Sequence, residues 1–492
     1  MTGLERLMNR LEILYKKRTP RSFRLFRRAQ NVMIQGGSHS LRLLAPYPFF
    51  VRRASGPEVV DIDGNVYVDY WQGHYANILG HNPVIPDDPP AGEEPEDPSL
   101  HTGFEGEDQV KLAEILIRQA GWKGHKVRFT TSGTLAAMYA VMLACGRTGR
   151  EEVLKIGGGW HGASPLLLKG IAYDRSLGFA KIESAGVPSA FGKKIHTVRY
   201  NDSEGLIRFL RRRGEKIACF ILEPYLGAGG FLPADREYLQ TAREWTSRLG
   251  IVLVFDEIIS GFRFAPTGVG RLAGVEPDLA TFGKAIGGGH AVAAVMGKTD
   301  ILECLLPRTG RAAVRFSGGT YSAHPQYMRA GLRMIRHLVR RGPEIYPRIA
   351  AMGERLRRGI EDAFAAEGID ARCTGGGNEV IPGSSLFMPH FLRVPREIRE
   401  AGDVLDPRRA DVRMKEEILR LALLTRSVHV VHGGGAVSAA HREGDIDRTI
   451  EAYRDAARLL NPDVLRKKPR SGPLGRENNR RRGCRTFQDP AF

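Results

Sequence analysis

Short apolar runs alternate with longer amphipathic stretches between residues 127 and 300. The runs have the length of buried strands, and the stretches between them have helical periodicity. Apolar strands separated by helices indicate an α/β fold with a mostly parallel sheet that helices cover on both faces. The predicted strands are 127–130, 153–156, 217–222, 251–256 and 291–296, and the predicted helices include 134–145, 203–213 and 235–249.

The first residues have the spacing of an amphipathic helix, which we expect to pack on the body of the protein. A mitochondrial transit peptide is the alternative, but this segment carries two glutamates and few serines. Two strands follow at 59–62 and 66–70, joined by a turn. The helical face is formed by Leu4, Leu7, Leu11 and Leu14.

The C-terminal third of the chain is mainly helical. Residues 322–366 predict a long helix that ends at Gly342-Pro343 and a second helix after it, because proline interrupts helices. The prolines spaced among acids at 83–98 predict an exposed loop. The predicted parts of the chain are an N-terminal segment (1–75) that packs with the small domain, a large domain (76–330), a small α+β domain (331–460) and a basic disordered tail (461–492).

Composition and charge limit the classes of function. The 492-residue chain is 42% hydrophobic and has no apolar run near the ~18 residues that cross a bilayer, so we expect a cytoplasmic protein without a membrane partner. Five scattered cysteines and fourteen histidines show neither CxxC nor HExxH spacing, so no disulfide framework or metal site is indicated. Residues 1–28 and 466–492 carry +7 each of the formal +18, so we expect no specific nucleic-acid partner.

An acid and a lysine follow two neighbouring apolar runs. Asp256 ends the strand at 251–256, where α/β proteins bind ligands, although an aspartate capping the next helix would look the same. Lys284 follows 28 residues later among glycines and small apolar residues, which solvate its charge poorly. Desolvation lowers the pKa of an amine, and the neutral amine forms Schiff bases. The pair therefore suggests pyridoxal phosphate, with Lys284 holding the aldehyde and Asp256 keeping the pyridine nitrogen protonated.

The chain also offers a phosphate site and a platform for the ring. Ser132, Gly133 and Thr134 end a strand and open a helix, whose N-terminus binds phosphate. An ordinary helix cap fits these residues equally well. Trp160 follows a glycine run after another strand, where its indole would stack on a pyridinium face, unless it is a buried core residue.

At this point the sequence resembles the class III branch of fold-type I pyridoxal-phosphate enzymes, in particular the glutamate-1-semialdehyde 2,1-aminomutase-like aminotransferases. The resemblance implies a large domain with a mostly parallel seven-stranded sheet and a smaller α+β domain. It extends from about Ser22 to Leu460. The segments that carry it are 60–64, 79–81, 128–134, 160–162, 222–224, 256–263, the surroundings of Lys284, and 432–435.

The resemblance assigns roles to individual residues. Lys284 would form the Schiff base with pyridoxal 5'-phosphate and move protons, Asp256 would pair with the ring nitrogen, and Ile258 and Trp160 would cover the two ring faces. Ser132, Gly133 and Thr134 would hold the phosphate. Thr320 would reach that phosphate from the neighbouring subunit, which implies a homodimer with its active site at the interface.

Substrate recognition is implied at three further positions. Arg42 lies where related enzymes bind a carboxylate, a task that suits a guanidinium, although it is also one of many basic residues near the N-terminus. Arg263 is the next candidate for that carboxylate. Trp71 and His74 match positions beside the substrate. The aminomutase typically has tryptophan at the position of His74.

We therefore expect an aminotransferase that moves an amino group from an amino acid to a 2-oxo acid. Three more departures from the aminomutase pattern support this choice, namely Thr131, Leu135 and Ala228. The alternatives are the aminomutase itself, an isomerase that uses the same residues, and a non-catalytic binding protein with this fold.

Overall fold

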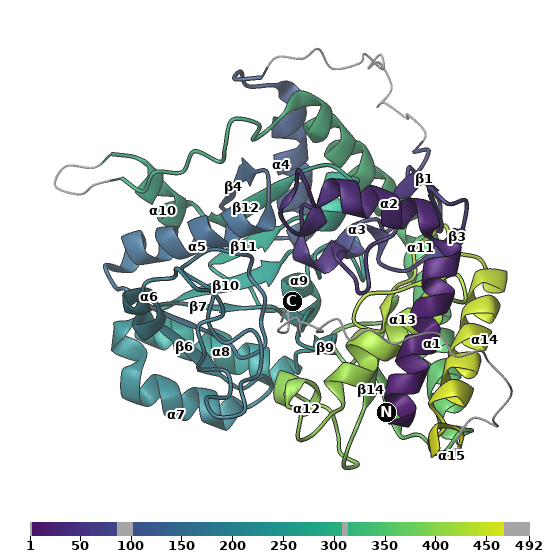
Figure 1. Ribbon diagram of the computed structural model, residues 1–492. Coiled ribbons are helices and arrows are strands. Elements are labelled where there is room, and N and C mark those ends of the chain that lie inside the picture. The colour runs from purple at the N-terminus through teal and green to yellow at the C-terminus, as the bar shows by residue number, and fades with distance from the viewer. Residues whose placement is uncertain (1, 86–101, 308–312, 467–492) are drawn as a thin grey trace, which may run out of the picture.

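The structure is a computed structural model that describes residues 2–85, 102–307 and 313–466. Its largest element is a seven-stranded sheet in the order β4-β12-β11-β10-β7-β5-β6 (Figure 1). All neighbouring strands run parallel except β12, which is antiparallel to β11 and to β4. The strands are β4 (His125–Thr130), β5 (Glu152–Ile156), β6 (Ile195–Val198), β7 (Ile217–Leu222), β10 (Val252–Glu257), β11 (Leu279–Phe282) and β12 (Ala293–Lys298).

The predicted α/β fold with a mostly parallel sheet is confirmed. Alternating residues of the strands pack against helices on opposite faces, since Val252 and Val254 lie in the core under α5 (Gly133–Thr148) while Leu253 and Phe255 lie in the core under α7 and α8. These last helices are Ser203–Arg213 and Arg236–Leu249. Sequence periodicity missed β6 and β11, which are only four residues long.

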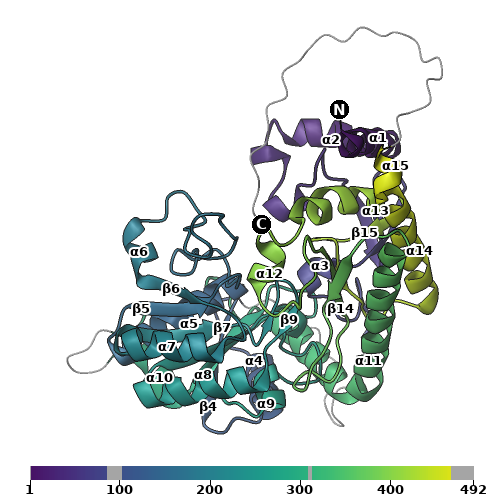
Figure 2. The ribbon, with the colours of Figure 1, turned by 90° about the horizontal axis from the view of Figure 1, so that it is seen from below.

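The N-terminal residues join the C-terminal part of the chain. Strands β1 (Val51–Ser55), β2 (Glu58–Asp61) and β3 (Val66–Asp69) form a sheet with β15 (Val428–His429), which pairs parallel to β3. Figure 2 shows α1, α2, α13, α14 and α15 on one side of the molecule and the large sheet with its helices on the other. The predicted domain boundaries stay a prediction.

Helix α1 (Gly3–Arg18) confirms the predicted N-terminal helix but not every residue of its face. Leu7, Leu11 and Tyr15 are buried, whereas Leu14 is 41% exposed. The buried stripe continues at Tyr15 because it lies one helical turn, four residues, after Leu11. The helix contacts α13 (Arg420–Leu424) and α15 (Pro462–Arg466).

The predicted helix break at Gly342-Pro343 is wrong. Helix α11 runs without interruption from Pro325 to Ala365, with Pro343 and Pro347 inside it. Buried side chains on both sides of the prolines, from Leu338 to Ile349, keep the helix packed on the core. This burial outweighs the hydrogen bonds that the two prolines remove.

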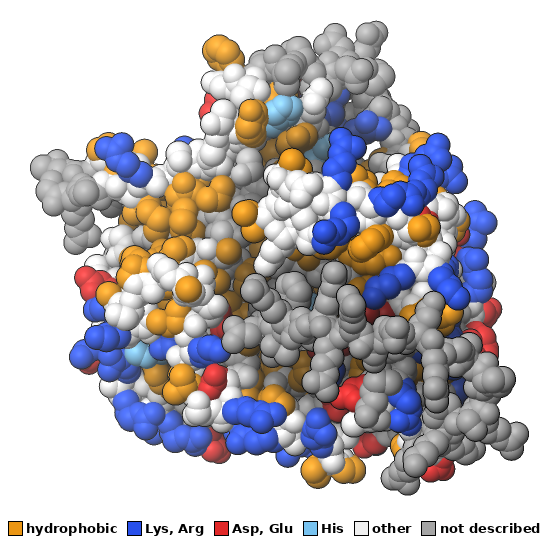
Figure 3. All heavy atoms as spheres, viewed as in Figure 1, with side chains coloured by type: hydrophobic (Ala, Val, Ile, Leu, Met, Phe, Trp, Pro, Cys, Tyr) orange, Lys and Arg blue, Asp and Glu red, His pale blue; other side chains and the backbone are white. Residues whose placement is uncertain are grey.

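Two predicted irregular segments fall mostly outside the described residues. The proline-rich segment at 83–98 is described only to residue 85, and the tail only to residue 466. Within the range predicted as tail, α15 forms a short helix after α14 (Glu443–Leu460), and Leu465 packs against the core. Among the described helices, none has the length and apolar character needed to span a bilayer. In Figure 3, Lys and Arg side chains gather over α1 and α2 (Pro20–Ala29) and are scattered elsewhere on this face.

Candidate active site

The site lies where β10 and β11 end side by side. Asp256 pairs in register with Thr281 on the neighbouring parallel strand, and Lys284 begins the short helix η4 (Lys284–Gly287) just beyond β11. Parallel strands bring their carboxyl ends to one edge of the sheet. The two residues that the sequence pairs are therefore close enough for the charge of Asp256 to act on the Lys284 amine.

Asp256 is a buried carboxylate with a partner on each oxygen. It is 3% exposed. One oxygen accepts hydrogen bonds from Thr281 Oγ1 at 3.0 Å and the Ile258 amide at 3.1 Å, and the other lies 2.8 Å from His161 Nδ1. The next helix, α9 (Val269–Ala273), begins thirteen residues further on, so Asp256 does not cap a helix.

Lys284 has an activated amine. Burial lowers its pKa to about 8, although the negative charges of Asp256 and Glu223 act in the opposite direction. Its φ of 45° places the backbone in the left-handed region, which is strained for a side chain other than glycine. A lysine with this pKa has a substantial neutral fraction near neutral pH, as Schiff-base chemistry requires.

Ser132, Gly133 and Thr134 form the N-terminus of α5. The Ser132 hydroxyl accepts a hydrogen bond from the Leu135 amide at 3.3 Å, so this serine does cap the helix. Thr134 Oγ1 accepts from the Ala163 amide at 3.4 Å, and a Cβ on Gly162 would lie only 2.3 Å from the same oxygen. The glycine therefore permits the close approach of this loop to the helix N-terminus, an anion-binding position.

Ile258 lies between that helix end and the lysine loop. A Cβ on Gly133 would contact Ile258 at 3.1 Å, and one on Gly283 at 2.9 Å. Trp160 is half-buried and follows β5, and its amide donates to Glu223 Oε1 at 2.8 Å. The structure thus brings Ile258 and the phosphate-site residues together and fixes the Trp160 backbone in the same network.

Three residues of this network were assigned no role from the sequence, although His161 and Glu223 lie in segments that carry the family resemblance. His161 contacts Asp256, Glu223 accepts from the amides of Trp160 and Gly227, and Lys155 donates from within a buried strand to the carbonyls of Gly159, Leu167 and Lys169. Burial and the nearby Asp256 raise the pKa of Glu223 to about 8, and burial lowers that of Lys155 to about 8. Lys155 carries no sequence signal, since it is surrounded by apolar strand residues.

The residues present fit pyridoxal phosphate. A buried acid, an amine of lowered pKa and a capped helix N-terminus are the groups that its ring nitrogen, aldehyde and phosphate need. His161 Nε2 is buried without a hydrogen-bond partner, and burial lowers the pKa of this ring, so it is neutral beside Asp256. The described residues contain no group of three side chains able to bind a metal ion.

A strained turn forms one wall beside Lys284. Gln72, Gly73, His74 and Tyr75 all have positive φ, between 45° and 66°. Asp69 accepts hydrogen bonds from the amides of Trp71 and Gln72 and lies 2.7 Å from both His81 and His429. Arg263 donates to the carbonyls of Tyr75 and Ile259 and is only 2% exposed. It therefore stabilises the turn and is not available to bind a substrate carboxylate.

Trp71 and His74 lie together on this wall. Their rings are 4.3 Å apart, and the His74 ring is 5.0 Å from that of His39. Burial lowers the pKa of His74 to about 4, with further contributions from the charges of His39, Arg42 and Lys284. His74 is therefore neutral at physiological pH and close to the reactive lysine.

Arg42 and Thr320 are the most exposed of the predicted site residues. Arg42 ends the short helix η2 (Ser40–Arg42), and its side chain donates a hydrogen bond of 3.4 Å to Ser38 Oγ. Its charge acts on His39 and His74, so it faces the same wall. Thr320 is exposed on a turn, and a Cβ on the preceding Gly319 would lie 3.7 Å from Thr131 Oγ1. This places the turn near the phosphate-site residues of its own chain.

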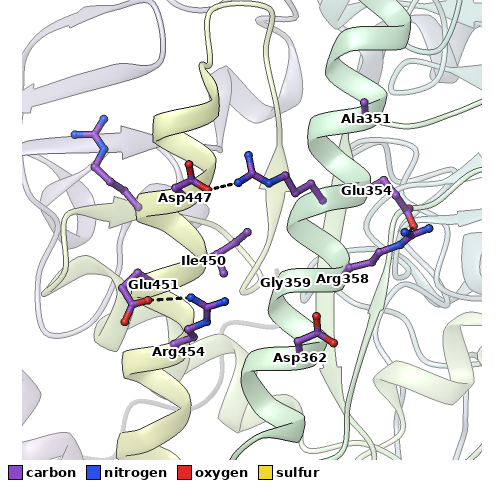
Figure 4. Close-up of a pocket in the computed structure, with 11 residues that line it drawn as sticks. Ala351, Glu354, Arg358, Gly359, Asp362, Asp447, Ile450, Glu451 and Arg454 are labelled. Carbon is purple, nitrogen blue, oxygen red and sulfur yellow. Dashed lines mark hydrogen bonds and ion pairs between the residues drawn. The ribbon is translucent and has the colours of Figure 1, made fainter.

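A second hollow lies away from these residues. A groove of about 840 Å³ runs along the surface where α11 and α14 pack together, and it is lined by acids and arginines. Figure 4 shows Arg454 turned toward Glu451 across one side of the groove. Arg355 pairs with Asp447. Exposed, mutually paired charges of this kind offer no nucleophile or desolvated acid, so the groove is not a candidate active site.

Comparisons with known proteins agree with this geometry. Residues 42–375 match the family model for class III aminotransferases. Glutamate-1-semialdehyde 2,1-aminomutase of Methanothermobacter thermautotrophicus is 33% identical, with 88% of this chain and 98% of that protein covered. The enzyme of the same name from Akkermansia muciniphila is 34% identical with the same coverage.

A solved structure gives the same result. A transaminase with pyridoxal phosphate bound superposes with a TM-score of 0.76 and 28% identity, over 91% of this chain and 99% of the other. The residues that match the family model make up more than half of this chain. The alignments with the two aminomutases cover almost the whole length of those proteins. The protein is a class III aminotransferase family member of fold type I, and pyridoxal 5'-phosphate is its cofactor.

Proposed function

We propose that this protein transfers an amino group on a carboxylate-bearing substrate, with Lys284 as the proton-moving residue. The observation that carries the proposal is the placement of the Lys284 amine, its pKa lowered to about 8, at the same sheet edge as the buried Asp256. This chemistry requires a neutral amine close to a carboxylate. Lys284 and Asp256 meet that requirement at the ends of adjacent strands.

Each residue around the lysine would have a distinct task. When bound, pyridoxal phosphate supplies an aldehyde for the substrate amine and a ring that accepts the electrons of a broken C–H bond. Lys284 would hold that aldehyde and then carry the proton at the substrate carbon. Asp256 would keep the ring nitrogen charged, and its hydrogen bonds from Thr281 and the neutral His161 would keep the carboxylate in place. These contacts support the assignment because they hold the carboxylate of Asp256 in one orientation.

The remaining predicted residues would bind rather than react. Ser132, Gly133 and Thr134 would hold the phosphate, Trp160 and Ile258 would cover the ring, and Arg42, Trp71 and His74 would contact the substrate. Thr320 would complete the phosphate site of a partner subunit in a homodimer; its exposure in the single chain supports this. An amino acid and, for transamination, a 2-oxo acid are the proposed substrates of a cytoplasmic enzyme.

Two forms of the reaction share these residues. The names of the curated relatives support the aminomutase, the alternative from the sequence, better than the aminotransferase that the sequence places first. The aminotransferase is the second candidate because His74 occupies the position of the aminomutase tryptophan and lies beside Trp71 and Lys284. The two forms differ in products, since only transamination releases an oxo acid.

A product assay separates the two forms. The holoenzyme is mixed first with glutamate-1-semialdehyde and then, separately, with a panel of amino acids, and isomer and oxo acid are both quantified. Formation of the amino isomer without net oxo acid supports the aminomutase. Stoichiometric oxo acid with loss of the cofactor's aldehyde absorbance supports the aminotransferase, and neither product from any amine would overturn amino-group transfer.

A further inference from the structure

Arg420 is a half-buried arginine with few partners, and part of its guanidinium is enclosed. It begins α13, and its Nη2 donates a long hydrogen bond of 3.5 Å to the carbonyl of Leu41. Its Nε is buried and has no hydrogen-bond partner, and no carboxylate of the described residues lies within ion-pair distance. A guanidinium offers five N–H donors, and leaving an enclosed charge unpaired is costly.

The acid near Arg420 is already paired with other residues. Glu416 lies 2.9 Å from His432 Nδ1 and 3.6 Å from Lys415 Nζ. Its side chain is 32% exposed, so part of it faces solvent at this wall. Positive charge therefore remains in excess at this wall, which favours an anionic ligand.

Tyr75 supplies a second unsatisfied donor. It is 8% exposed, and its hydroxyl is buried without a partner. Among the charged groups, Glu416 and Arg420 act most strongly on that hydroxyl. Tyr75 ends the left-handed turn at a φ of 66°, its ring packs against Phe231, and Arg263 holds its carbonyl. The chain thus maintains a strained backbone and an unpaired hydroxyl, a combination that recurs at binding sites.

Both groups adjoin the proposed substrate residues. Arg420 contacts Leu41, which precedes Arg42. Tyr75 follows His74, and burial together with the charges of Arg42 and Lys284 lowers the pKa of the His74 ring. The short helix that carries Tyr75, α3 (Gln72–Tyr75), also contacts η4, which begins with Lys284. Arg420 and Tyr75, which are distant in sequence, therefore both lie at the wall beside Lys284.

We propose that Arg420 and Tyr75, together with Arg42, bind the carboxylate of the substrate. The Arg420 N–H groups and the Tyr75 hydroxyl would donate to a carboxylate that Arg42 approaches from the solvent side. The inference deepens the proposed function, because it names the residues that hold the substrate's carboxylate. Charge-assisted hydrogen bonds from two arginines suit a planar carboxylate.

The test measures binding in the absence of turnover. Calorimetry on the holoenzyme compares pentanoate with pentanamide, which has a similar shape but no charge. We expect Arg420→Gln to weaken pentanoate binding by about tenfold or more while pentanamide binding stays within twofold. Arg420→Lys should recover only part of the loss, because an ammonium lacks the planar fork.

Tyr75→Phe gives a cleaner variant. It removes an oxygen that has no partner in the protein, so the melting temperature of the ligand-free holoenzyme should stay the same or rise. Pentanoate should nevertheless bind severalfold more weakly. Arg355→Gln, in the groove between α11 and α14, is the control and should leave pentanoate binding unchanged.

Several results would overturn the inference. Pentanoate affinity within twofold of the parent in folded Arg420→Gln or Arg420→Lys would do so, as would equal losses for pentanoate and pentanamide. Equal affinity of the parent protein for both compounds would also contradict it. Because these measurements need no reaction, they separate a failed carboxylate site from a failed amino-transfer function, which the product assay detects.

Discussion

The floor of the site around Asp256 and the wall at residues 71–75 differ in how their polar groups are satisfied. On the floor, both oxygens of Asp256 and both of Glu223 accept hydrogen bonds, and Lys155 donates to three carbonyls. On the wall, the Tyr75 hydroxyl and Gln72 Oε1 have no partner, and Arg420 has one long contact. Apart from His161 Nε2, these floor groups are satisfied without a substrate, whereas the wall has donors left for a ligand.

The backbone shows the same contrast. The floor residues Asp256 and Thr281 lie at the ends of regular parallel strands. The wall has four consecutive left-handed residues, three of which are not glycine. Such strain persists only where surrounding contacts enforce it, here Asp69 and Arg263. We propose from this comparison that the floor defines the chemistry and the wall defines the substrate.

Removal of Lys284 should have the largest effect. In the proposed function the Lys284 amine both holds the cofactor and moves the proton, so Lys284→Ala should lower turnover by about 10³-fold or more while the fold survives. Steady-state assays with circular dichroism as the stability check measure this. Lys298→Ala, which alters the next lysine along the chain, should keep most of the activity; the reverse pattern would move the chemistry away from the floor.

Substitution of Arg42, on the exposed side of the wall, tests whether the wall binds the substrate carboxylate. Losing one partner of a charge-assisted pair that the substrate desolvates costs about 2 kcal/mol or more, so Arg42→Ala should lower kcat/KM by about 30-fold or more. Arg42→Lys should recover part of the loss. An amine substrate without a carboxylate should be affected much less, and an equal loss for both substrate types would mean that Arg42 does not bind the carboxylate.

The pH dependence of cofactor capture tests the floor. A Lys284 pKa of about 8, against 10.5 for an ordinary lysine, gives about 300-fold more neutral amine at neutral pH. The neutral fraction rises with pH, so the rate at which apoprotein binds pyridoxal phosphate should rise to a plateau just above pH 8. A rate that kept rising toward pH 10.5 would show that Lys284 is not desolvated.

The groove between α11 and α14 should give the smallest effect. Arg355 pairs with Glu443 and Asp447 but is 44% exposed. Exposed pairs contribute less than about 1 kcal/mol, so Arg355→Gln should lower the free energy of unfolding by no more than that and leave turnover unchanged. Denaturant titration measures the first quantity, and a loss of turnover would mean that the groove is coupled to the site.

The sequence predicted the floor better than the wall, for physical reasons. Asp256 and Lys284 follow apolar strands, and parallel strand ends necessarily meet at one edge. Lys155 was missed because a lysine inside an apolar strand gives no sign that three carbonyls surround it. The turn at 72–75 was missed because Gln, His and Tyr disfavour the left-handed conformation that tertiary contacts impose. Arg420 meets Tyr75 only through a contact between distant parts of the chain.

The most direct test of the account is chemical trapping of the cofactor. Borohydride reduction of the holoenzyme fixes pyridoxal phosphate to the amine that holds it, and peptide mapping by mass spectrometry identifies that residue. The account predicts a single labelled peptide with the cofactor on Lys284, and loss of the label in Lys284→Ala. A label on Lys155, Lys298 or any other lysine would contradict the assignment of Lys284 and the floor built around it.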